Sequence, residues 1–173
     1  MTRQPLRQKG GGPTENRNKG IASKKGKQLS FFGEWETKMV RPEVVRDKDK
    51  LVVWNIGYQG RTQESFIKTL REAGVTVLVD LREKPFSRIA GFSKNVLRTA
   101  LEEAGIAYRG MGQILGGLTC TPEMWAEGCQ EVAKLAQGEA VAIMCLERDA
   151  AQCHRRKLVK ILETEHGIAS VPL

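Results

Sequence analysis

The segment from Cys145 to Arg156 holds the residues most able to do chemistry, because two thiols, a histidine, two acids and three guanidiniums fall within twelve positions. Thiolates and carboxylates act as nucleophiles, general bases or metal ligands, and guanidiniums bind phosphate or carboxylate. An apolar run precedes the segment (residues 140–144) and a run with helical spacing follows it (156–162). We therefore expect these groups to lie where a buried strand ends and a helix begins.

The two thiols of this segment have different environments. Cys145 ends the apolar run and can be an ordinary core residue, which is the commoner role of a cysteine. Cys153 is expected in the first turn of the following helix, where the helix dipole and neighbouring cations favour the thiolate. Cys153 is therefore the favoured reactive thiol, although Cys145 can lie closer to a ligand.

Cys145, Cys153 and His154 could also supply three metal ligands. Their spacing matches no usual zinc pattern, adjacent Cys and His residues rarely bind one ion together, and no Cys-x-x-Cys pair completes the set. We expect no metal and no other cofactor, and a thiol or metal sensor remains the weakest alternative.

Two carboxylates are candidates for acid–base chemistry. Asp80 directly follows an apolar run, so it is expected to be partly buried and to need a partner, either Arg82 or Arg155. Glu147 could act as a general base together with Asp80, as in chemistry at a glycosidic carbon, or could form a salt bridge with Arg155. Structural and catalytic roles stay open for both acids.

Apolar runs alternate with segments of helical spacing from residue 51 onward. The run at 75–79 has no polar alternation, which is typical of a parallel strand buried on both faces. Three helical segments end in glycine followed by a β-branched residue, at Gly74, Gly105 and Gly167, as helix-to-strand joins do. The sequence predicts a three-layer α/β fold with a mostly parallel sheet of about five strands and helices on both faces.

In such a sheet the loops after the strands converge on one edge, where open α/β folds bind ligands. These loops carry many arginines and glycines, which suit an anionic ligand such as a phosphate. The candidate ligand-binding residues are Gly57, Tyr58, Arg82, Ser87, Arg88, Gly116, Gly117, His154 and Arg155. The candidate catalytic residues are Asp80, Cys145, Glu147 and Cys153.

The net charge of +8 comes mainly from the start of the chain. Residues 1–28 hold eight Lys/Arg and one acid, whereas residues 51–173 hold fifteen Lys/Arg and fourteen acids. We predict a disordered basic tail at 1–28, an aromatic and basic connecting segment at 29–50 and an α/β domain at 51–173. The tail is either a solubilising extension or an arm that binds nucleic acid.

No apolar run approaches the length of a membrane span, and the first residues lack the apolar centre of a secretory signal. We therefore expect a cytoplasmic protein with no membrane partner, and its four cysteines are expected to be reduced.

The domain resembles the prokaryotic family known as domain of unknown function 488. The resemblance rests on Ile56-Gly57-Tyr58, Val79-Asp80-Leu-Arg82, Pro85-Phe-Ser87-Arg88, Gly91-Phe92-Ser93, Tyr108 with Leu115-Gly116-Gly117, and Met144-Cys145-Leu-Glu147 with Cys153-His154-Arg155. It implies an α/β domain with shared polar residues at the strand ends and no established reaction. Asn55 departs from the Thr or Ser that the family often has, and Ala150 or Ala151 stands where a proline is common.

The leading hypothesis is an enzyme-like domain, a hydrolase or transferase, that binds a phosphate-bearing ligand such as a nucleotide or nucleic acid. A non-catalytic nucleic-acid-binding module that uses the basic tail is the alternative.

Overall fold

The computed structural model describes residues 50–117 and 119–173. The predicted tail at 1–28, and the connecting segment up to residue 49, lie outside the described residues. The elements in chain order are β1 (Val52–Gly57), α1 (Gln63–Glu72), β2 (Val77–Asp80), α2 (Lys94–Glu103), β3 (Ala107–Gly110), α3 (Gly112–Leu115), α4 (Pro122–Gly138), β4 (Val141–Cys145), the 3₁₀ turn η2 (Ala150–Gln152), α5 (Arg155–His166) and β5 (Ala169–Pro172).

The five strands form one sheet in the order β3-β2-β4-β1-β5, and every neighbouring pair is parallel. This confirms the predicted parallel sheet. Strand β4 lies between β1 and β2, with Gly57 opposite Cys145 and Asp80 opposite Met144. The carboxyl ends of these three strands therefore meet at one edge, and Asp80 and Cys145 lie on that same edge.

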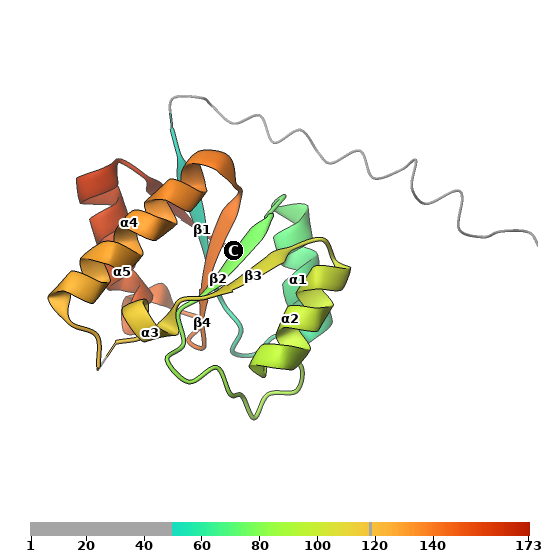
Figure 1. The fold of residues 1–173 in the computed structure, drawn as a ribbon. Helices are drawn as coiled ribbons and strands as arrows, with labels where there is room; N and C mark the ends of the chain where they lie inside the picture. The colour runs from blue at the N-terminus through green and yellow to red at the C-terminus, as the bar shows by residue number, and fades with distance from the viewer. Residues whose placement is uncertain (1–49, 118) are drawn as a thin grey trace, which may run out of the picture. The chain divides into compact units, whose positions relative to one another are not determined.

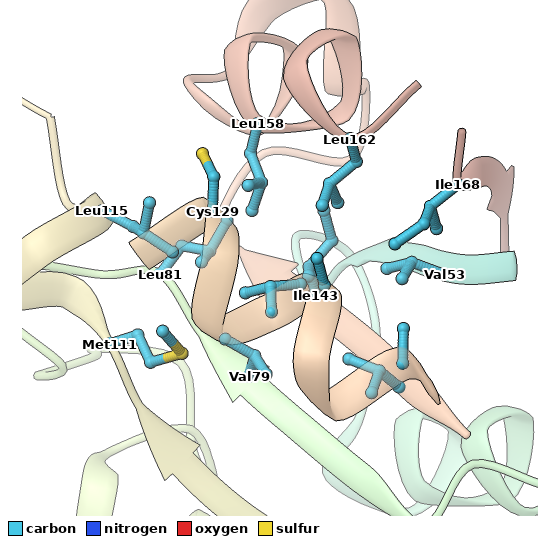
Figure 2. Close-up of a cluster of buried hydrophobic side chains, with 14 of the residues drawn as sticks. Val53, Val79, Leu81, Met111, Leu115, Cys129, Ile143, Leu158, Leu162 and Ile168 are labelled. Carbon is cyan, nitrogen blue, oxygen red and sulfur yellow. The ribbon is translucent and has the colours of Figure 1, made fainter. Parts of the chain in front are cut away.

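Helices cover both faces of the sheet, as predicted (Figure 1). Helices α1 and α2 pack on one face through Phe66, Leu70, Leu97 and Leu101, all fully buried. Helices α4 and α5 pack on the other face, where Cys129, Leu158 and Leu162 gather around Val53, Val79 and Ile143 (Figure 2). Burying a side chain of this size contributes about 1.5–3 kcal/mol, so the two cores hold the sheet rigid beneath its loops.

Local interactions define most helix ends, and the three predicted glycine joins are confirmed. Thr62 and Thr121 cap α1 and α4 through their hydroxyl groups, and the glycines at 74, 105 and 167 adopt left-handed backbone conformations. Helix α5 starts later than expected, because Cys153 was predicted to lie in its first turn. The Asp149 side chain accepts a hydrogen bond from the Ala151 amide and caps a short 3₁₀ turn, so α5 begins only at Arg155.

None of the helices formed by the described residues has both the length and the apolar character needed to cross a membrane.

The end of β1 packs directly against the loop that follows β4. A Cβ atom built on Gly57 would lie 1.8 Å from the carbonyl oxygen of Glu147, which is closer than any real contact. Gly57 is therefore required by backbone packing between two loops, and no space is left there for a phosphate group.

We expect Gly57→Ala to destabilise the domain by about 3 kcal/mol, the upper end of ordinary overpacking costs, because the clash involves backbone. Gly138→Ala is the matched control, since its added methyl group would meet nothing within 4 Å and should change stability by less than ~1 kcal/mol. Urea unfolding measures both. Equal stabilities of the two variants would contradict this account of the loop packing.

Candidate functional site

Two thiols and one imidazole meet beyond the end of β4. The Nδ1 atom of His154 lies 3.9 Å from the sulfur of Cys145 and 3.8 Å from the sulfur of Cys153. Both cysteines are buried, with exposed fractions of 4% and 8%. The structure thus brings together three of the residues singled out from the sequence, and each offers a group that can donate or accept a proton.

Cys153 and His154 are consecutive, and a change of backbone conformation lets both side chains reach the same point. Cys153 has an extended backbone (φ −126°, ψ 152°), whereas His154 is already helical (φ −60°, ψ −17°). The chain therefore bends between the two residues as it enters α5. Cys153 lies before the helix and not in its first turn as predicted, but its sulfur still accepts a hydrogen bond from the Arg155 amide at 3.4 Å.

A backbone carbonyl fixes the orientation of the His154 ring. The Nε2 atom lies 3.1 Å from the carbonyl oxygen of Leu81, just past the end of β2. Because a carbonyl can only accept, Nε2 must carry a proton and donate it. The Nδ1 atom of the neutral ring then presents a lone pair to the two thiols.

The two thiols differ in acidity. The hydrogen bond from the Cys145 thiol lowers the pKa of Cys153, with further help from His154 and the Arg155 amide and against the effect of burial. The same contact with Cys153, together with burial, raises the pKa of Cys145. The neighbouring Cys153 also raises the pKa of His154, although burial opposes this. The contact between the two thiols therefore makes Cys153 the more acidic of the pair.

Glu147 lies beside the thiols but forms no salt bridge with Arg155. Its carboxyl group is close enough to contribute to the pKa shifts of Cys145, Cys153 and His154. Its Oε2 atom is buried and has no hydrogen-bond partner among the described residues. Of the two roles left open by the sequence, the salt bridge with Arg155 therefore does not form.

Arg155 is fully buried and holds the loop after β4 in place. Its Nη2 donates to the carbonyl oxygens of Glu147 and Arg148. Its Nε and Nη1 atoms have no partner among the described residues. A buried guanidinium without an acidic partner makes the surrounding potential positive, which favours an anionic ligand.

Asp80 and Arg82 form a buried ion pair at the end of β2. The guanidinium contacts both carboxylate oxygens, the shortest contact being 2.6 Å from Nη2 to Oδ2. Their side chains are 0% and 6% exposed. Arg82 is thus the partner that Asp80 was predicted to need, and neither charge is free to meet a ligand.

Two tyrosines complete this ion pair. The Tyr58 hydroxyl accepts from Nη1 of Arg82 at 3.1 Å, and the Tyr108 hydroxyl donates to Oδ2 of Asp80 at 2.7 Å. Burial and the bond to Asp80 raise the pKa of Tyr108. The Tyr58 ring stacks on Phe92 with centroids 4.4 Å apart. Tyr58, one of the candidate ligand-binding residues, therefore supports the fold of this edge.

The remaining candidates divide between packed and open positions. The Ser87 hydroxyl accepts a hydrogen bond from the Ile89 amide, and its backbone bonds to Ser93, so Ser87 shapes the loop after β2. Gly116 is packed against the carbonyl of Gly112. Arg88 is exposed, and Gly117 borders open space.

Sequence reasoning missed three features of this edge. The Leu81 carbonyl that orients His154 has no sequence signal, because any residue could supply it. Tyr108 could have been paired with Asp80, since a polar hydroxyl in a short strand next to a buried acid needs a partner. Phe86 is 75% exposed in the loop that also carries Arg88, and exposed aromatic rings in loops often mark binding surfaces.

The fold and the site define an α/β protein with a parallel sheet and a buried thiol–imidazole cluster at the carboxyl ends of its strands. The family model described as "Domain of unknown function DUF488" matches residues 62–122 and 119–162, and the chain belongs to this family. No protein with a curated description and no solved structure matches the chain.

We expect Asp80→Asn to destabilise the domain by about 3–5 kcal/mol, because it leaves the Arg82 charge buried without its partner. Glu102→Gln breaks an exposed pair with Arg98 at 3.8 Å and should cost less than ~1 kcal/mol. Chemical unfolding of both variants measures the difference. A loss below ~1 kcal/mol for Asp80→Asn would show that the ion pair does not hold this edge together.

Proposed function

We propose that the domain is an enzyme, a hydrolase or transferase, that binds a phosphate-bearing ligand at the carboxyl edge of β1, β2 and β4. The observation that carries this proposal is the meeting of Cys145, Cys153 and His154, with Glu147 beside them, on a sheet edge of the kind that binds ligands in α/β proteins. Glu147 acts as the general base, and Asp80 acts through Arg82 as a positioning residue.

Charge and exposure favour a phosphate as the anionic group. Arg88 is exposed in the loop after β2, and no described residue forms a salt bridge with it. The buried guanidinium of Arg155 adds positive potential without an acidic partner. Exposed arginines bind phosphate through charge-assisted hydrogen bonds, whereas Arg82 is already committed to Asp80.

Phe86 favours a ligand that contains a base. Its ring is 75% exposed and lies two residues from Arg88 on the same loop. Leaving an aromatic ring in water is unfavourable unless a partner covers it, and nucleobases stack on such rings with about 1–3 kcal/mol per base. An arginine and an exposed aromatic ring together fit a nucleotide or a single-stranded nucleic acid better than free phosphate.

Two variants of the full-length chain test the ligand class by calorimetric titration with a nucleoside monophosphate and with inorganic phosphate. Arg88→Gln should weaken both about tenfold, because a charged hydrogen bond contributes about 1.5–3 kcal/mol. Phe86→Ala should weaken only the nucleotide, also about tenfold, because phosphate has no base to stack.

The controls carry the same kinds of substitution away from this loop. Lys134→Gln removes an exposed charge near the carboxyl end of α4, and Val96→Ala removes an exposed apolar side chain from α2. Both should bind like the unmodified chain. If neither probe gives saturable binding, or if Lys134→Gln weakens binding as much as Arg88→Gln, the proposed ligand site is wrong.

A further inference from the structure

Three potential metal ligands lie together at the site. The sulfurs of Cys145 and Cys153 and a ring nitrogen of His154 all lie within 4.8 Å of one another. The three residues are buried or partly buried, so the donor atoms are shielded from competing water. We propose that these three side chains bind one Zn²⁺ ion.

The distances fit a tetrahedral ion with little movement. Zinc binds sulfur at about 2.3 Å and imidazole nitrogen at about 2.0–2.1 Å, which places a sulfur and a nitrogen ligand about 3.6 Å apart. The two sulfur-to-nitrogen distances here are 3.9 Å and 3.8 Å. A contraction of a few tenths of an ångström brings each sulfur to its ideal distance from the imidazole nitrogen, and the two sulfurs, within 4.8 Å of each other, need to approach to about 3.8 Å.

The His154 ring is held as a metal-binding histidine is held. Ligating histidines usually donate their second ring N–H to a carbonyl or carboxylate, which fixes the tautomer and the ring plane. The contact of 3.1 Å between Nε2 and the Leu81 carbonyl does this here and leaves Nδ1 facing both sulfurs. The bend between Cys153 and His154 removes the objection that adjacent residues cannot bind one ion.

The donor set selects the kind of metal. Two sulfurs and one imidazole suit Zn²⁺, whereas Mg²⁺ and Ca²⁺ require oxygen ligands. Two thiolates also neutralise the charge of a dication, so the pair can be buried at moderate cost. All four cysteines and both histidines of the chain belong to the described residues, and only these three lie together as a ligand group there.

The metal gives the proposed function a nucleophile. Three protein ligands leave the fourth position of a tetrahedral ion for water, as in catalytic zinc sites, and the ion lowers the pKa of that water to about 7. Glu147, two residues after Cys145, has a buried oxygen that lacks a partner among the described residues and would be available to hydrogen-bond that water. This catalytic role depends on the proposed function, whereas metal binding does not.

The test measures metal binding by the reduced full-length chain without any phosphate ligand. We expect one Zn²⁺ per chain, and Co²⁺ should give the visible spectrum of a tetrahedral site with a thiolate-to-cobalt band. Cys153→Ser and His154→Asn should weaken binding at least about 100-fold, the upper end of losses caused by outer contacts alone. Cys120→Ser and His166→Asn, outside the cluster, should bind normally.

Alkylation of the unmodified chain keeps the proposal testable if the cluster variants fail to fold. Zn²⁺ should protect Cys145 and Cys153 from a thiol reagent, and a chelator should restore their reaction, while the partly exposed Cys120 should react in both states. Equal alkylation with and without Zn²⁺, or a Co²⁺ spectrum that persists in Cys153→Ser, would overturn the metal site. Nucleotide binding by a chain that binds no metal would overturn this inference alone, and metal binding without nucleotide binding would overturn only the proposed function.

Discussion

The buried ion pair between Asp80 and Arg82 is the interaction on which the functional edge depends. Its groups also bind the hydroxyls of Tyr58 and Tyr108 and the carbonyl of Phe92. These partners come from β3, from the turn after β1 and from the loop after β2, so one charge pair ties three segments together. An unpaired buried charge costs several kcal/mol, so the positions of these three segments depend on one another.

The ion pair also reaches the reactive cluster. Leu81 lies between the two charged residues, and its side chain is buried in the core beneath α4 and α5. The side chains of residues 80 and 82 form the hydrogen-bond network on one side of the chain. The side chain of residue 81 points to the other side and packs into the core. The carbonyl of Leu81 then sets the orientation of His154. A structural network at the end of β2 thereby fixes the direction of the lone pair that faces the two thiols.

The sequence was sufficient for the fold because the fold depends on local signals. The apolar run ending at Val79 and the glycine joins each depend on the residue and its close neighbours, and both were confirmed. The arrangement of the cluster of Cys145, Cys153 and His154 depends on less local interactions, so the sequence did not predict it. The Asp149 cap delays the start of α5 to Arg155, so Cys153 lies before the helix, and the bend there turns Cys153 and His154 toward one point.

The glycines and arginines also show a limit of prediction from sequence, because groups expected to meet a ligand are already in contact with the protein. Gly57 was interpreted as a position where a phosphate approaches the backbone, but the group that approaches it is the carbonyl of Glu147. Arg82 was named both as a ligand-binding candidate and as a partner of Asp80, and the structure shows the ion pair with Asp80. Residue type indicates which contacts a side chain can make, and only the three-dimensional structure shows which of them the protein already uses.

The charge pattern of the cluster favours the proposed cation. Full ionisation of both thiols would place two negative charges within 4.8 Å of each other in a buried setting, where their repulsion is strong. A shared proton relieves this repulsion in the free protein, and a dication between the sulfurs would relieve it more completely. Arg155 is buried nearby, but its Nη2 is directed to the carbonyls of the loop. Arg155 therefore does not fill the space between the sulfurs and the imidazole, and a smaller cation can bind there.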